Sequence, residues 1–308
     1  MPSIASALAL PELLPCAHQA RGIPLSSPSI VAALLLAALA GCASRPAPTG
    51  VAVPAGPTNL PEPQVPPFAT APFQPISAQS VVAIALREWR LFGQPVDDDP
   101  PDTRPPPPPD QKPEREPGLW QRVGEYWWLG MNYGIPEGGW TGKTDGQGVV
   151  FPAHVDAHYA WSAAFISYVM RIAGAGPRFP YSEAHSTYID VAVEQRLGQA
   201  SGWLVLAERP SEYAPKPGDL ICTGRASRRT LTYDDLPAGR FPSHCAIVVA
   251  AAPGQIQIIG GNVDDAVTLT HVPVTPDGRL AGDDGVVLDS RYPWMVVIKM
   301  LYPGVPVS

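Results

Sequence analysis

Apolar residues recur at three- and four-residue intervals in four stretches of the chain, and each stretch ends at a glycine. This spacing is typical of amphipathic helices. It predicts helices over residues 77–93, 119–134, 159–176 and 182–198, with serines as candidate N-caps of the first and last. The third segment, YAWSAAFISYVMRIAGAG, carries Ser162 in its first turn, beside a tryptophan.

The pattern changes after residue 198, where short apolar runs alternate with clusters of proline and glycine. Such runs are typical of strands. The predicted strands cover residues 218–223, 244–251, 255–259, 266–271 and 294–301. Because helices come first and antiparallel-type strands follow, the sequence predicts an α+β fold, with N-terminal helices packed on an antiparallel sheet.

The N-terminal region carries a short apolar run, IVAALLLAALAGC, which follows Arg21 and ends at Cys42. A positive flank, a short apolar core and small residues at its end are typical of a secretory signal, here residues 1–41. The run is too short for a comfortable membrane span. The last four residues, LAGC, resemble a bacterial lipobox. The resemblance implies cleavage before Cys42, acylation of this cysteine and a protein anchored to the outer membrane, facing the periplasm. The alternative is an ordinary signal peptide with a chance cysteine.

Two proline-rich stretches organise the rest of the chain. Residues 42–75 have no apolar period and are predicted to form an extended tether. Residues 76–308 form the predicted domain, with a proline-rich insertion at about 94–117. The insertion is expected to be a solvated surface segment, or a docking site for a protein partner that recognises proline-rich sequence.

Composition removes several functional classes. The chain has 308 residues and a net charge of −7, which gives no basic footprint for nucleic acid. It has no Gly-x-Ser-x-Gly elbow, Walker loop or dinucleotide fingerprint. No cofactor is therefore expected.

Histidine and cysteine spacing gives two further hypotheses. His154 and His158 flank an aspartate and could form half of a metal site, but the preceding Pro152 favours a turn. No metal site is predicted, and the histidines are expected to cap the helix or line a cleft. Cys222 and Cys245 show no Cys-x-x-Cys spacing. In an exported protein this pair could form a disulfide, and the sequence leaves this open.

Three polar residues could form a nucleophilic site. Such a site needs a hydroxyl or thiol, a base within reach and a third group that orients the base. Ser162 lies near a helix N-terminus, where unpaired N–H groups favour developing negative charge. His244 opens one predicted strand and Asn262 follows the next, which makes them plausible neighbours at one sheet edge.

The motifs around these residues occur in a familiar order: WSAAFISYVMRIAG, KPGDLI, SHCAIVV and GGN. Together they resemble the NlpC-type and CHAP amidase superfamily, whose helix motif is close to WCAAFVSWVLRQAG. A closer resemblance is to a bacterial family of unknown function that keeps Trp-Ser. The resemblance covers about residues 159–301. It implies a papain-like fold, cleavage of amide bonds in cell-wall peptides, and Ser162 as nucleophile, His244 as base and Asn262 as orienting residue.

Serine at the nucleophile position departs from the superfamily pattern. A serine hydroxyl is far less acidic than a thiol, so it must lose its proton to the base during attack. Three interpretations follow: a working Ser-His-Asn site, an inactive descendant that binds the cell wall or a protein partner, or ordinary helix-start chemistry. His185 and Tyr188, one helical turn apart, are candidate substrate-binding residues with Trp161 and His158; the alternative is that these side chains pack in the core.

Overall fold

A computed structural model describes residues 74–101, 103, 105–131 and 135–304 of the chain. The predicted signal peptide, Cys42 and nearly all of the predicted tether lie outside these residues. The helices of the described part are α3 (Ala78–Leu91), α4 (Leu119–Gly130), α5 (Ser162–Ile172) and α6 (His185–Arg196). No helix within this part is long and apolar enough to cross a membrane.

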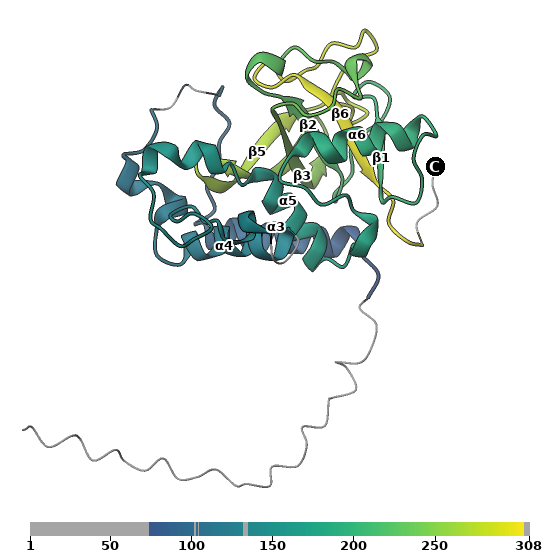
Figure 1. Ribbon diagram of the computed structural model, residues 1–308. Helices are drawn as coiled ribbons and strands as arrows, with labels where there is room; N and C mark the ends of the chain where they lie inside the picture. Colours follow the sequence, from purple (N-terminus) through teal and green to yellow (C-terminus); the bar gives the residue numbers. More distant parts are fainter. Residues whose placement is uncertain (1–73, 102, 104, 132–134, 305–308) are drawn as a thin grey trace, which may run out of the picture. The chain divides into compact units, whose positions relative to one another are not determined.

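The strands of the described part form one sheet, and every pairing in it is antiparallel. They are β1 (Val205–Glu208), β2 (Leu220–Gly224), β3 (Ser243–Ala252), β4 (Gln255–Val263), β5 (Ala266–Pro273) and β6 (Trp294–Met300). Their order across the sheet is β1-β6-β2-β3-β4-β5. Figure 1 shows α3, α4 and α5 together on one side of this sheet.

The predicted α+β class is confirmed, with differences at element boundaries. Strand β1 was not predicted, because its four residues show no clear alternation between buried and exposed positions. Helix α5 begins at Ser162, three residues later than predicted, because Ala153–Tyr159 forms a separate 3-10 helix. Helix α6 begins at His185, and Ala184 is its N-cap in place of the predicted Ser182.

Two apolar clusters cover the two faces of the sheet. The larger joins buried residues of α3, α4, α5 and α6 to one face, which includes Ile247, Ile259 and Val296. The smaller lies on the other face, where Ala246, Val248 and Ile258 meet buried residues of the surrounding loops. Alternate residues of β3 therefore enter different clusters, as the two-residue period of a strand requires.

A glycine sets the approach of α5 to β4. A Cβ on Gly261 would lie 2.6 Å from Cβ of Phe165, a separation that two side chains cannot adopt. The missing side chain thus lets the helix lie directly against the strand. This contact brings the first turn of α5 to the end of β4, where the candidate site lies.

The proline-rich insertion connects α3 to α4. At its start, the N–H of Asp97 donates to the carbonyl of Leu269 on β5 over 2.9 Å. At its end, Lys112 lies 3.3 Å from a carboxylate oxygen of Asp156 and 3.3 Å from one of Asp265. Both ends are therefore fastened to the domain, while most of the prolines between them are exposed.

Candidate functional site

Ser162 is the first residue of α5 and is almost buried, with 5% of its surface exposed. The N-cap residue, Trp161, provides no side-chain cap for the helix. Its indole instead donates to a carboxylate oxygen of Glu114 over 2.6 Å. Trp161 therefore connects the start of α5 to Glu114 of the insertion. The N–H groups of the first turn, next to Ser162, have no side-chain cap.

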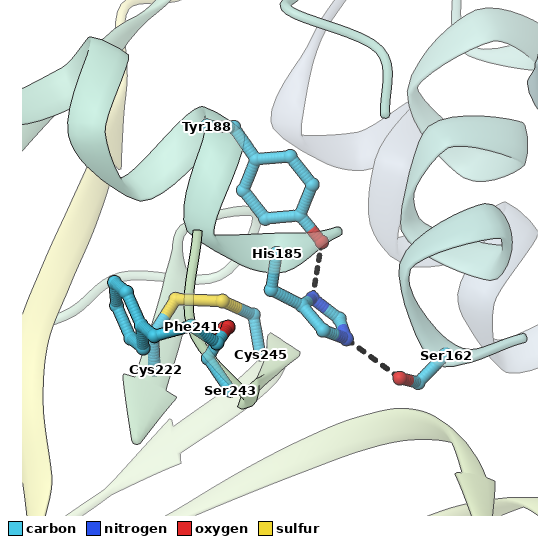
Figure 2. The surroundings of a disulfide bond; sticks show 7 residues. All are labelled: Ser162, His185, Tyr188, Cys222, Phe241, Ser243 and Cys245. Carbon is cyan, nitrogen blue, oxygen red and sulfur yellow. Dashed lines mark hydrogen bonds between the residues drawn. A yellow bond between two sulfur atoms is a disulfide. The ribbon is translucent and has the colours of Figure 1, made fainter. Parts of the chain in front are cut away.

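The hydroxyl of Ser162 lies 2.6 Å from Nε2 of His185, at the start of α6. On the other side of the same ring, Nδ1 is hydrogen-bonded to the hydroxyl of Tyr188. Figure 2 shows the imidazole held between the two hydroxyls. His185 and Tyr188 lie three residues apart on α6, so one helical face supplies both groups.

The direction of these hydrogen bonds depends on the tautomer of His185. A neutral imidazole has one N–H donor and one acceptor nitrogen. If Nδ1 donates to Tyr188, Nε2 accepts from Ser162 and can take its proton. If Tyr188 donates to Nδ1, Nε2 donates to Ser162 instead. Because a tyrosine hydroxyl can do either, it does not enforce one tautomer as an aspartate does.

Burial keeps this cluster neutral. It lowers the pKa of His185 well below 6.5, and the nearby His244 and Arg225 lower it further by electrostatic repulsion. Burial also raises the pKa of Tyr188 well above 10. Both side chains are consequently uncharged near neutral pH, which leaves a lone pair of His185 available but offers little stabilisation to an imidazolium.

His244 lies beside His185 without touching Ser162 through any hydrogen bond of the described residues. The two imidazole rings are 5.4 Å apart between centroids, at an interplanar angle of 63°. Nδ1 of His244 is buried and has no hydrogen-bond partner. Burial lowers the pKa of His244 to about 3, and Arg225 adds to the shift. The predicted base thus lies next to the histidine that contacts the serine.

The fixed position of His244 depends on Gly260. A Cβ at residue 260 would lie 2.8 Å from Nε2 of His244, so the ring occupies the space that a side chain on β4 would fill. Two residues further along β4, Asn262 has a φ of +56°, a left-handed conformation that asparagine tolerates better than most residues. The sequence did not single out Gly260. Asn262, predicted to orient His244, makes no hydrogen bond with it among the described residues, and Nδ1 of His244 has no partner.

Ser162, His185, His244 and Asn262 all line one cleft with a volume of about 1300 Å³. The structure therefore brings the three predicted catalytic residues to one cavity, together with His185. The cleft is bordered by the proline-rich insertion, by the loop between β2 and β3, and by the ends of β3 and β4. Its lining on the insertion includes Pro100, Pro101, Pro105, Pro106, Pro107 and Pro113.

The remaining predicted substrate-binding residues do not line this cleft. Trp161 is 1% exposed and packs against Phe92 and Tyr126 in the core, where no substrate can reach it. Tyr188 is completely buried, where it is hydrogen-bonded to His185 and packs against Phe179. His158 is exposed in the 3-10 helix but is not part of the cleft wall. Among the described residues, no group of His, Cys, Asp or Glu side chains could hold a metal ion.

The two internal cysteines form a disulfide that joins β2 to β3. Cys245 follows His244 on the strand and faces the opposite side of the sheet, toward the larger apolar cluster. Cys222 pairs with Cys245 in the strand register, one residue before the pair formed by Thr223 and His244. Figure 2 shows the disulfide near the imidazole of His185. It therefore fixes the strand from which His244 projects.

Comparison with known proteins gives one match. The model of a bacterial family described as "Uncharacterized protein conserved in bacteria (DUF2272)" matches residues 114–300. This region contains Ser162, His185, Tyr188, His244 and Asn262, whereas the part of the cleft wall formed by residues 97–113 precedes it. No curated protein and no solved structure matches the chain.

Proposed function

The chain belongs to this uncharacterized bacterial family, and we propose that it is a hydrolase of papain-like fold that cleaves an amide bond in cell-wall peptides. The observation that carries the proposal is the 2.6 Å separation between Ser162 Oγ and Nε2 of His185, at a helix start that opens on a large cleft. A hydroxyl in contact with a neutral imidazole is the arrangement that nucleophilic catalysis requires.

In the proposed reaction, Ser162 attacks the amide carbonyl as its proton passes to Nε2 of His185. The resulting tetrahedral oxyanion lies by the N–H groups of the first turn of α5. His185 then gives the proton to the leaving amine, and the acyl group remains on Ser162. Water, activated by the same nitrogen, hydrolyses this ester and restores the hydroxyl.

We assign the base to His185 in place of His244, because His185 holds the hydrogen bond to Ser162. Tyr188 then occupies the orienting position predicted for Asn262. For the ring to accept the proton of Ser162, Nδ1 must carry the other proton and donate it to Tyr188. His244 and Asn262, both on the cleft wall, are left to contact substrate.

We further place the protein outside the cytoplasm, anchored by lipid on Cys42 to the outer membrane and facing the periplasm. The apolar N-terminal run and LAGC support this placement. The Cys222–Cys245 disulfide agrees with it, because structural disulfides persist in oxidising compartments and are rare in the cytosol.

A second candidate function is binding of cell-wall peptide without cleavage. The observation in its favour is that the partner of His185 is a tyrosine, which stays neutral, while burial and Arg225 disfavour the imidazolium that catalysis must form. A carboxylate at this position would stabilise that ion. The same cleft would then hold a peptide without activating Ser162.

Digestion of purified peptidoglycan separates the two functions. The protein and its Ser162→Ala and His185→Gln variants are incubated with peptidoglycan, and new amine termini are followed by mass spectrometry. Both variants should lose cleavage by about 10³-fold or more. Ser167→Ala is the matched control, since Ser167 is a buried serine on α5 that bonds to the carbonyl of Ser182. It should keep the wild-type rate.

Two outcomes would count against the hydrolase. Cleavage that persists in Ser162→Ala removes the serine from the mechanism. Absence of cleavage by the wild-type protein, with co-sedimentation of protein and insoluble peptidoglycan, favours the binding function instead.

A further inference from the structure

The cleft carries opposite charges on two parts of its wall. Acidic residues gather near the proline-rich insertion, and arginines gather on the loop between β2 and β3. The acidic lining residues near the insertion are Asp97, Asp156, Asp264 and Asp265. The arginines are Arg225, Arg229 and Arg240, and one further acidic residue, Glu183, lines the cleft on their side. Whether each part is already neutralised by the protein itself decides which one is available to a ligand.

The acidic part contains its own cations. Lys112 lies 3.3 Å from Asp156 and 3.3 Å from Asp265, and Arg115 lies 2.8 Å from the other oxygen of Asp156. These side chains are mostly buried. The charges of these four side chains are therefore paired with one another, and the pairs hold the end of the insertion to the domain.

Two of the arginines are also engaged. Arg240 pairs with Glu183 over 3.0 Å, which offsets its charge. Arg229 donates to the carbonyl of Arg291 over 2.7 Å, which occupies its side chain without neutralising it. Arg225 differs, because its exposed side chain makes no hydrogen bond or ion pair with any residue of the described part. It lines the cleft with its guanidinium uncompensated.

The backbone of Arg225 is nevertheless fixed. Its N–H donates to the carbonyl of Pro242 over 2.9 Å, and its carbonyl accepts from the N–H of Arg228 over 2.9 Å. It directly follows β2, whose Thr223 is paired with His244 in the register. The arginine is thus presented from a defined position beside the histidines.

Arg225 acts electrostatically on both histidines. After burial itself, its positive charge is a cause of the lowered pKa values of His185 and His244. The buried and unpartnered Nδ1 of His244 lies in the same wall. A cation, two neutral imidazoles and an unsatisfied ring nitrogen therefore share one part of the cleft, and no acidic side chain of the described part pairs with the cation.

From this arrangement we infer that the cleft recognises a peptide with a free carboxylate close to the bond that Ser162 attacks, and that Arg225 binds this carboxylate. The inference rests on the proposed function. The planar guanidinium matches a carboxylate through two parallel hydrogen bonds. A cavity of about 1300 Å³ is larger than typical drug-sized pockets and accepts a peptide of several residues.

Carboxylate binding also has a consequence for catalysis. Once the anion offsets the charge of Arg225, the repulsion that disfavours a protonated His185 is reduced. The carboxylate then both anchors the peptide and makes it easier for His185 to accept the proton of Ser162. An otherwise identical amidated peptide lacks both effects.

Binding is measured without turnover, in the Ser162→Ala protein, so that the result does not depend on catalysis. The probes are the peptidoglycan stem tetrapeptide with free carboxylates and the same peptide with its carboxylates converted to carboxamides. By isothermal titration calorimetry, the free acid should bind about tenfold more tightly or better. Adding Arg225→Gln should remove this preference, and Arg225→Lys should keep part of it.

Arg178→Gln is the matched control, since Arg178 is another exposed arginine outside the cleft. It should leave the preference unchanged, and thermal unfolding checks that each variant is folded. Equal affinity for the two peptides, or a preference that survives Arg225→Gln, overturns the inference. Ser162-dependent cleavage of peptidoglycan can still be observed in that case, so the two experiments test the two proposals independently.

Discussion

Two buried polar clusters lie along helix α5, and they differ in how completely their hydrogen bonds are satisfied. The first involves Tyr168 in the second half of the helix. There Glu88, which is completely buried, accepts from Arg122 over 2.9 and 2.8 Å and from Tyr126 over 2.7 Å. Tyr168 adds a further bond to Glu88 and accepts one from Arg122. No residue of this cluster lines the cleft.

The second cluster begins at Ser162, the first residue of the same helix. Its groups are neutral, it opens on the cleft, and Nδ1 of His244 is left without a partner. We call the first cluster closed, because its charged and polar groups are bonded to one another and join helices. We call the second cluster open, because an unsatisfied group next to a cavity is available to a ligand. This contrast distinguishes a structural from a functional cluster when both are buried and polar.

The largest expected effect is in the closed cluster. Glu88→Ala should lower the free energy of unfolding by about 3–5 kcal/mol, because it leaves the Arg122 guanidinium partly buried without its main counter-ion. Urea denaturation measures the change. Glu125→Ala is the control, since Glu125 pairs with the same arginine but is half exposed. It should cost less than about 1 kcal/mol. Equal losses of unfolding free energy in the two variants would contradict the structural role assigned to the Glu88 cluster.

The next effect concerns the pH dependence of the open cluster. The pKa of His244 is about 3 in the folded protein and about 6.5 when exposed. Between pH 3 and pH 6.5 the unfolded chain therefore binds more protons than the folded protein. The stability that neutral His244 provides is therefore present above pH 6.5 and is lost as the pH falls toward 3, at about 1.4 kcal/mol per pH unit.

Unfolding at pH 7 and pH 5 tests this dependence. On going to pH 5, the wild type should lose about 2 kcal/mol more than His244→Gln. His154→Gln, at an exposed position, should follow the wild type. An unchanged pH profile in His244→Gln would contradict the burial of a neutral ring. Burial raises the pKa of Glu114 to about 8, so its contribution to stability increases as the pH falls, opposite to that of His244. Glu114 is present in all three proteins, so this contribution does not affect their comparison.

The smallest effect is the difference in stability loss between one tyrosine from each cluster. Tyr126→Phe removes a bond to an ionised carboxylate and should cost about 1.5–3 kcal/mol, while Tyr188→Phe removes a bond between neutral groups and should cost about 1 kcal/mol. Urea denaturation of both variants gives the two values. A larger loss for Tyr188→Phe would mean that the open cluster is the more structural of the two.

The sequence was informative about Ser162 and less so about its partner. Helical periodicity and a neighbouring tryptophan placed the serine at a helix start, where the structure has it. His185 and Tyr188 were recognised as one helical face, but were assigned to substrate. The signal for a His–Tyr pair was present in their three-residue spacing. The contact with Ser162 was not, because it depends on where α6 lies relative to α5.

Arg225 carried no sequence signal at all. Its residue type is common on surfaces, and only its position beside two buried histidines distinguishes it. The sequence likewise left the disulfide undecided, since two cysteines 23 residues apart can pair only if β2 and β3 align in the observed register. Trp161, considered as a substrate contact, is buried by packing that involves α4 and the insertion.

The sequence by itself determined the four α-helices and every strand except β1, and that helices pack on an antiparallel sheet. It could do so because periodicity is a local property, set by the geometry of each element. Only the tertiary structure decided which imidazole meets Ser162, which cysteines join and which charge in the cleft is left uncompensated. Those outcomes depend on contacts between residues far apart in the chain, and such contacts are fixed by the packing of whole elements.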